Sequence, residues 1–197
     1  MDVQQTRLSP QDIATIARRI ERPIVLVGMM GVGKSSVGRR LAQILDCSFV
    51  DADDEIERSA QMTIPEIFDS FGEEYFRNGE RRVIARLIED APAENGAHHG
   101  VIATGGGAFC NAETRKLILD RAIAVWLDSE VATLVDRVGR KGNRPLLRGG
   151  DPAEIIARLR AEREVHYAQA PIHIMSGHAP HQHTVNKVLQ GIGQWLS

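Results

Sequence analysis

A glycine-rich segment followed by a lysine and a serine carries the clearest chemical signal in this chain. It spans residues 28–35, Gly-Met-Met-Gly-Val-Gly-Lys-Ser, and fits the pattern G-x-x-x-x-G-K-[ST]. Glycines at this spacing let the backbone wrap a phosphate chain with its N–H groups pointing inward, and the positive end of a following helix attracts the same anion. Lys34 would reach the β- and γ-phosphates, and the Ser35 hydroxyl would ligate Mg²⁺. These residues predict a nucleoside triphosphate site.

The residues on either side of this loop support that interpretation. Residues 24–27, Ile-Val-Leu-Val, are apolar and rich in β-branched side chains, which is typical of a buried parallel strand. Residues 36–45 carry apolar side chains at helical spacing. We therefore expect the loop to join a strand to a helix. The alternative is a purely structural glycine turn.

A run of acidic residues is the second candidate for chemistry. Five carboxylates occur within residues 51–57, directly after a strand predicted at residues 47–50. Ligands of open parallel sheets bind beyond the carboxyl ends of the strands, and alternate spacing at a strand end would let Asp51 and Asp53 both face that site. A magnesium–nucleotide site needs a carboxylate there. The alternative is a solvated helix start, because acidic residues favour the first turn of a helix.

Two further segments are expected at the same edge. Three glycines, residues 105–107, follow a strand predicted at residues 101–104 and permit close approach of the backbone to a ligand. Residues 139–151 are rich in glycine and cations and have no apolar period, which is typical of a mobile lid. Such a lid would expel water and deliver an arginine to the phosphates. An idle surface loop is the alternative.

The rest of the chain alternates strands with helices. Further strands are predicted at residues 122–127 and 172–175. A short helix is predicted to start at Thr63, and a break at Gly72 separates it from a longer helix that follows. Further helices are predicted at residues 114–119, 130–138, 151–169 and 181–196. This alternation predicts a five-stranded parallel sheet in a three-layer α/β/α fold.

Composition sets broad limits on the function. The chain has 197 residues, 43% of them hydrophobic and 25% charged, with a net charge of −2, so we expect one soluble globular domain. This charge balance gives no general attraction to nucleic acid, and no apolar run approaches the ~20 residues of a membrane helix. The first residues lack the pattern of a signal peptide, and the two cysteines lack metal-ligand spacing. We expect a cytoplasmic monomer with no nucleic-acid or membrane partner.

Residues 1–22 precede the first strand and are predicted to be an extension of the main domain at residues 23–197. Ser9, Pro10 and Asp12 fit the start of a helix with a capping box. Isoleucines then line one helical face. This face could pack on the domain or bind a partner.

The candidate residues together predict phosphoryl transfer to a small molecule. Lys34, Ser35 and Asp51 suit a magnesium–nucleotide, and catalysis of this reaction depends mainly on positioning and charge neutralisation. Asp53, Arg77 and an arginine of the helix at residues 151–169 would line an acceptor pocket with the glycine triplet. Such a pocket suits a small polyol with a carboxylate, because paired arginines bind the acid group and an aspartate holds hydroxyl groups.

The chain resembles the shikimate kinase family over roughly residues 24–190. The motifs that carry the resemblance are, in order, G-M-M-G-V-G-K-S, F-V-D-A-D-D-E-I-E, I-P-E-I-F, F-G-E-E-Y-F-R-N-G-E, A-T-G-G-G-A, R-P-L-L and R-x-x-x-Y. The resemblance implies an adenylate-kinase-like P-loop fold with a mobile lid. It also implies transfer of the ATP γ-phosphate to the 3-hydroxyl of shikimate, with Mg²⁺ as cofactor, in the route to chorismate and aromatic amino acids.

By motif position, the resemblance implies roles for individual residues. The implied catalytic residues are Lys34, Asp53 and the lid arginine Arg144. The implied ATP-binding residues are Gly31, Val32, Gly33, Lys34, Ser35, Ser36, Arg137 and Arg144, with Arg137 packing on adenine. The implied shikimate-binding residues are Asp53, Arg77, Gly105, Gly106, Gly107 and Arg163. The implied metal residues are Ser35 and Asp51.

Three alternatives stay open. Arg160 could take the place of Arg163, because the proline that the family often has between Arg163 and Tyr167 is absent here. The acceptor could be gluconate or a nucleoside monophosphate. The chain could also be a nucleotide-dependent regulator that acts on partners through its N-terminal helix.

Overall fold

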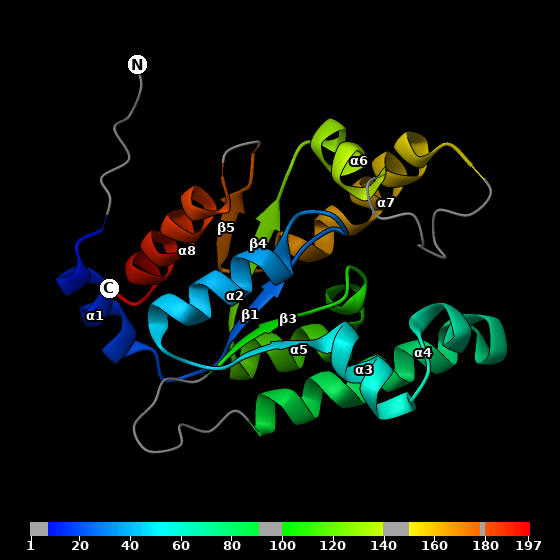
Figure 1. The fold of residues 1–197 in the computed structure, drawn as a ribbon, viewed down its shortest axis with the longest axis horizontal. Coiled ribbons are helices and arrows are strands. Elements are labelled where there is room, and N and C mark those ends of the chain that lie inside the picture. The colour runs from blue at the N-terminus through cyan, green and yellow to red at the C-terminus, as the bar shows by residue number, and fades with distance from the viewer. Residues whose placement is uncertain (1–7, 91–99, 140–149, 178–179) are drawn as a thin grey trace.

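The computed structural model describes residues 8–90, 100–139, 150–177 and 180–197. Its strands form one parallel five-stranded sheet in the order β2-β3-β1-β4-β5 (Figure 1). The strands are β1 (Ile24–Val27), β2 (Phe49–Asp51), β3 (Val101–Ala103), β4 (Ile123–Asp128) and β5 (Ile172–Met175). The α-helices are α1 (Pro10–Arg19), α2 (Lys34–Leu45), α3 (Ala52–Ala60), α4 (Ile64–Glu89), α5 (Ala112–Arg121), α6 (Val131–Gly139), α7 (Pro152–Tyr167) and α8 (His181–Trp195).

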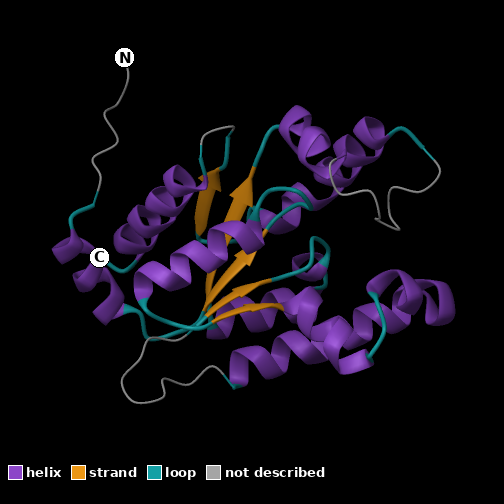
Figure 2. Ribbon diagram, viewed as in Figure 1, coloured by secondary structure: helices purple, strands orange, loops and turns teal. Residues whose placement is uncertain are grey.

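Helices cover both faces of this sheet (Figure 2). Helices α2 and α8 pack against one face, and α5 packs on β4 from the other. Helices α3 and α4 pack on each other beside β2, at one end of the sheet. The three central strands are fully or almost fully buried, as expected for parallel strands covered on both faces. The predicted three-layer arrangement is therefore present.

The strand register places three loops side by side. Leu26 of β1 pairs with Ala103 of β3, and Ala103 also pairs with Asp51 at the end of β2. Because all strands are parallel, the segments that follow these residues leave the sheet at the same edge. They are the glycine-rich loop, the acidic start of α3 and the glycine triplet.

Local capping explains where several helices begin. Ser9 and Asp12 form a reciprocal capping box at the start of α1, as predicted. Thr63 and Glu66 form a second box at the start of α4. Gly72, with φ 81° and ψ 175°, interrupts α4, so the predicted break between two helices is confirmed.

Several predicted boundaries were wrong by one or two residues, and one of these errors affects the site. Strand β2 begins at Phe49 and includes Asp51, and α3 begins at Ala52. Asp53 therefore lies in the first turn of a helix and does not alternate with Asp51 along a strand. Asp51 is the N-cap of α3, and its side chain accepts a hydrogen bond from the Asp53 backbone N–H. The strand ends at Asp51 because the chain turns into the helix at Ala52, so strand alternation does not reach Asp53.

Helix α1 packs on the domain. Ala17 and Ile20 join the main core, and a Cβ added to Gly193 of α8 would lie 3.0 Å from Ile16 Cδ1. Of the two uses considered for this apolar face, packing is the one the structure shows. No helix among the described residues is long and apolar enough to cross a membrane.

Candidate active site

The glycine-rich loop between β1 and α2 holds Lys34 by its own backbone. The Lys34 side chain is 9% exposed, and its Nζ donates hydrogen bonds to the carbonyl oxygens of Gly28, at 2.8 Å, and Met29, at 3.0 Å. Gly33 precedes α2 with φ 102°, a left-handed conformation that favours glycine. The ammonium group therefore folds back on the first residues of the loop, and the N-terminal N–H groups of α2 follow its last residue. A positive helix end of this kind binds phosphates.

The two predicted metal residues are in contact. Ser35 Oγ donates a 2.5 Å hydrogen bond to Asp51 Oδ2. A hydroxyl and a carboxylate oxygen fit Mg²⁺, which prefers hard oxygen ligands and takes the rest from water and substrate phosphates. No group of three or more His, Cys, Asp or Glu side chains in the described part of the chain could hold a metal ion.

The glycine triplet after β3 is closely surrounded by the predicted acceptor residues. A Cβ on Gly105 would lie 2.8 Å from Asp53 Oδ1 and would also clash with Glu80 Oε1. A Cβ on Gly107 would lie 2.7 Å from Arg77 Nη1. Only glycine allows these side chains to approach the backbone so closely. The structure thus brings residues from α3, α4 and the β3 loop to one point.

Arg77 is held by two carboxylates of its own helix. Its Nη1 donates to Glu80 Oε2 at 2.8 Å, and its Nη2 donates to Glu73 Oε1 at 3.0 Å. Glu80 is 3% exposed, whereas the Glu73 side chain is 56% exposed. Burial raises the pKa of Glu80, and the Arg77 charge opposes that shift. The buried acid therefore holds one terminal nitrogen of the guanidinium group, and the exposed acid, which accepts from Nε and Nη2, is the partner that solvent can replace.

Helix α7 supplies the second arginine. Arg163 Nη1 donates to the Gly106 carbonyl oxygen at 3.1 Å, and the Tyr167 hydroxyl donates to the same oxygen. Arg160 lies elsewhere: it is paired with Asp128, at the end of β4. Of the two candidate arginines, Arg163 is the one that reaches the glycine triplet.

On the nucleotide side, Arg137 connects the loop to the segment after β5. Its Nη1 donates to the Val32 carbonyl oxygen at 3.1 Å, and its Nη2 donates to the Gly177 carbonyl oxygen at 2.7 Å. The exposed Ser36 follows Ser35 in the first turn of α2, and a Cβ on Gly31 would lie 2.7 Å from Val138 of α6. Arg144 and most of the predicted lid lie outside the described residues.

Comparison with known proteins decides the family. A family model described as shikimate kinase matches residues 30–193. A shikimate kinase of Novosphingobium aromaticivorans is 61% identical over 196 residues, which cover 100% of each chain. The solved structure of a shikimate kinase from Acinetobacter baumannii in complex with shikimate is 35% identical and has a TM-score of 0.75, covering 89% of this chain and 92% of its own. The chain belongs to the shikimate kinase family.

Membership of the shikimate kinase family confirms two predictions. The fold is the three-layer α/β/α P-loop kinase fold of that family. The reaction class is that of an ATP-dependent phosphotransferase in aromatic amino acid biosynthesis, with ATP as co-substrate. The family model begins only at residue 30, whereas the Novosphingobium relative also aligns with the N-terminal extension.

Three residues near the site were missed from the sequence. Glu80 could have been found, because it lies three residues after Arg77 and such pairs share one helix face. Tyr167 was noted in a motif without a role, although its hydroxyl reaches Gly106. His181 has no role in the sequence-based prediction, but its ring atom Cε1 would lie 3.3 Å from a Cβ on Gly33. Burial lowers the pKa of His181, and the positive charges of Arg137 and Arg40 lower it further.

The Tyr167 hydroxyl offers a stability prediction. Tyr167 is 1% exposed, and burial raises its pKa, so the phenol stays protonated and donates throughout the neutral range. Tyr167→Phe is expected to lower the free energy of unfolding by about 1 kcal/mol, because Arg163 still serves the Gly106 carbonyl. Urea denaturation measures this. Tyr75→Phe, at a side chain that is 52% exposed, is the matched control, and equal losses in the two variants would contradict the prediction.

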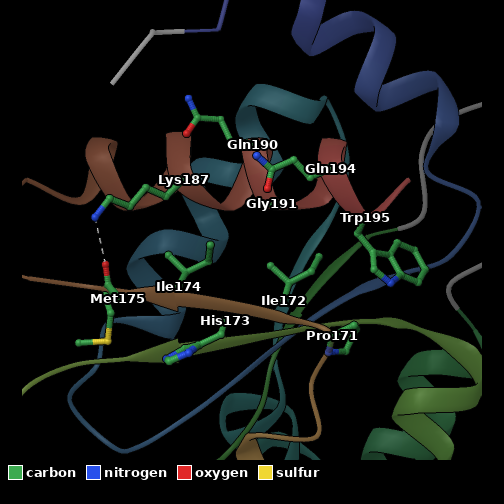
Figure 3. Close-up of a pocket in the computed structure, with 10 residues that line it drawn as sticks. All are labelled: Pro171, Ile172, His173, Ile174, Met175, Lys187, Gln190, Gly191, Gln194 and Trp195. Carbon is green, nitrogen blue, oxygen red and sulfur yellow. Dashed lines mark hydrogen bonds between the residues drawn. The ribbon is translucent and has the colours of Figure 1, made fainter. Parts of the chain in front are cut away.

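A groove away from this site lies between β5 and α8 (Figure 3). Ile172, Ile174, Lys187 and Trp195 are among its lining residues. Its lining includes none of the predicted site residues. We therefore separate it from the candidate active site.

Proposed function

We propose that this chain transfers the γ-phosphate of ATP to the 3-hydroxyl of shikimate, giving shikimate 3-phosphate and ADP. The observation that carries the proposal is the convergence of Asp53, Arg77 and Arg163 on the glycine triplet. This cluster adjoins the phosphate-binding loop, since a Cβ on Gly106 would lie 3.1 Å from the Met30 backbone nitrogen. An acceptor bound there lies next to the end of the nucleotide.

The two arginines account for an acidic acceptor. Arg77 and Arg163 come from different helices and approach the triplet from Gly107 and Gly106 respectively. A guanidinium fork binds a carboxylate at two points, and two of them orient the acid firmly. The acceptor carboxylate takes the place of the exposed Glu73 on Arg77, while the buried Glu80 keeps that side chain in position.

On the nucleotide side, Lys34 moves its hydrogen bonds from the loop carbonyls to the β- and γ-phosphates. Ser35 and Asp51 would hold Mg²⁺, whose charge neutralises the phosphate oxygens. Arg137 would pack on adenine, and Arg144 in the lid would reach the phosphates. Gly31, Val32, Gly33 and Ser36 would line the nucleotide.

Asp53 would contact the acceptor hydroxyl, a role supported by the closeness of its Oδ1 to Gly105. The transition state of phosphoryl transfer is loose and asks little of a base. We therefore assign Asp53 first to orienting the hydroxyl and second to accepting its proton.

The proposal is tested by measuring phosphate transfer from ATP to shikimate, gluconate, AMP and CMP with the purified chain. We expect transfer to shikimate alone. Transfer to gluconate or to a nucleotide, with none to shikimate, would overturn the proposal. A nucleotide acceptor is disfavoured because the two arginines and Asp53 occupy the acceptor side, where a base would need an apolar slot.

Arg77→Ala separates acceptor binding from nucleotide binding. We expect the shikimate KM to rise by about 10- to 100-fold with little change in the ATP KM, because a charge-assisted hydrogen bond contributes about 1.5–3 kcal/mol. Arg82→Ala, at an exposed position of the same helix, is the matched control. Equal increases of the two KM values in Arg77→Ala would instead make Arg77 a structural residue.

The regulator alternative has a separate test. Because Ala17 and Ile20 are part of the core, deleting residues 1–22 would expose core surface. A loss of activity could then come from lost stability and would not identify a regulator. Substituting the exposed Arg18 and Arg19 by alanine leaves that packing in place. An enzyme keeps its turnover in this variant.

We also propose a cytoplasmic monomer without nucleic-acid or membrane partners. Light scattering on the protein as it elutes from a size-exclusion column measures its mass and tests the monomeric state.

A further inference from the structure

We propose that Asp128 and Arg160 form a positioning pair that holds α7 so that Arg163 reaches the acceptor carboxylate. The inference rests on the proposed function, because that function assigns Arg163 to the acid group of shikimate. Neither Asp128 nor Arg160 touches the glycine triplet, and both act through the helix that carries Arg163.

The contact between the two side chains is a fork. Arg160 Nη2 lies 2.9 Å from Asp128 Oδ2, and Arg160 Nε lies 3.3 Å from Asp128 Oδ1. Asp128 is 5% exposed, and the Arg160 side chain is 26% exposed. Two parallel hydrogen bonds fix direction as well as distance. The pair therefore sets both the rotation of α7 about its own axis and the position of the helix relative to the end of β4 at this residue.

The carboxylate itself is held in place by its surroundings. The Ser129 backbone N–H donates to Asp128 Oδ1 at 2.8 Å. His173 Nε2 lies 3.4 Å from Asp128 Oδ2, and the His173 ring stacks on Trp126 at 3.8 Å between ring centroids. His173 projects from the side of β5 opposite Ile172 and Ile174, which face α8 (Figure 3). Asp128 is thus a fixed point on the sheet.

Helix α7 presents one face to the sheet. Ile156, Arg160, Arg163 and Tyr167 follow one another at intervals of four, three and four, the spacing of a single helix face. Arg160 holds this face at the end of β4, and Arg163 and Tyr167 hold it at Gly106 after β3. Arg160 and Arg163 are only three residues apart, which is roughly 4.5 Å along the helix axis. Because the helix moves as a rigid body, a small displacement of α7 at Arg160 displaces Arg163 by about the same distance.

Stability alone does not explain the pair. A buried ion pair contributes little stability compared with apolar residues of the same volume, and its best-attested use is to fix a register. The register fixed here is that of the helix carrying Arg163. Mispositioning of a binding group by about 1 Å can lower activity by up to about 10²-fold.

The test compares two arginines of the same helix. Arg160→Met removes the fork, and Arg158→Met removes an equal charge from a side chain that is 68% exposed and pairs only loosely with Glu162, at 3.8 Å. We expect the shikimate KM to rise about tenfold in Arg160→Met, within the range of a mispositioned group, while the ATP KM stays within about twofold. Arg158→Met is expected to leave both constants within about twofold. Calorimetric titration with shikimate measures the same loss without turnover.

A double-mutant cycle with Asp128→Asn completes the test. If the two residues act as one unit, the double variant Asp128→Asn/Arg160→Met raises the shikimate KM no more than the more affected single variant. Arg160→Lys keeps the charge but loses the fork, so it should give an intermediate KM, and it serves if Arg160→Met fails to fold.

Distinct outcomes overturn the two proposals. An active wild type in which Arg160→Met matches Arg158→Met, or in which the KM values for ATP and shikimate rise equally, would contradict the positioning role. Additive effects in the cycle would contradict the pairing. A folded wild type that does not phosphorylate shikimate would overturn the proposed function, and this inference with it.

Discussion

Replacing Asp53 by asparagine is expected to lower kcat with shikimate by about 10²- to 10⁴-fold, the usual contribution of a positioned acid–base group. Asparagine keeps the size of the side chain but loses its charge and its capacity to take a proton. The backbone N–H of Asp53, which donates to Asp51 Oδ1 at 3.1 Å, is unaffected by the change. The fold and the capping of α3 should therefore persist, and the loss should appear in turnover.

The adjacent acid provides the control. Asp54→Asn removes the same charge one residue further along the helix, from a side chain that is 61% exposed and lies 3.7 Å from Arg39. We expect its kcat to stay within about twofold of the wild type, since exposed pairs contribute little. Steady-state kinetics with thermal unfolding curves for both variants decide the matter. A wild-type kcat in Asp53→Asn would remove Asp53 from the mechanism.

Lys34→Met is the second change with a large expected effect. The ammonium group is buried and held by the carbonyls of Gly28 and Met29, the first two residues of the loop, and we propose that phosphate oxygens take over these hydrogen bonds. Preorganised charges of this kind stabilise developing charge in the transition state, and losing one costs about 10²- to 10³-fold in kcat. We expect a loss of this size, together with weaker ADP binding measured by calorimetry.

Methionine is chosen because it keeps most of the length and apolar volume of lysine. Arg39→Met, at a side chain of the same helix that is 60% exposed, controls for loss of a positive charge near the loop. Thermal unfolding shows whether freeing the Gly28 and Met29 carbonyls alters stability. Unchanged nucleotide affinity and unchanged kcat in a folded Lys34→Met protein would refute the assignment of the phosphate site.

Local chemistry explains why much of the fold could be predicted. The capping boxes of Ser9 with Asp12 and of Thr63 with Glu66 involve residues three apart, so their interactions are visible in the sequence. The break at Gly72 has the same origin, because a residue without Cβ adopts positive φ easily. Strand boundaries were less accurate, since strand ends depend on pairing with residues far away in the chain, as at Asp51 and Ala103.

The assignment of arginines on α7 shows where local patterns stop being informative. Arg158, Arg160 and Arg163 are equally cationic and lie within six residues of the same helix. Only the packing of α7 shows that Arg160 meets the buried Asp128, that Arg163 meets Gly106 and that Arg158 faces solvent. Motif position favoured Arg163, and the contacts show which group each arginine serves.

The sequence alone predicted a nucleoside triphosphate site between a strand and a helix, because the residues from Gly28 to Ser35 form one contiguous motif of backbone and side chains. It also determined the alternating α/β fold through apolar periodicity. The tertiary structure decided that Glu80 is buried beneath Arg77 and that Tyr167 and Arg163 share the Gly106 carbonyl. Burial and long-range hydrogen bonds arise only when distant segments pack together, and no local spacing records them.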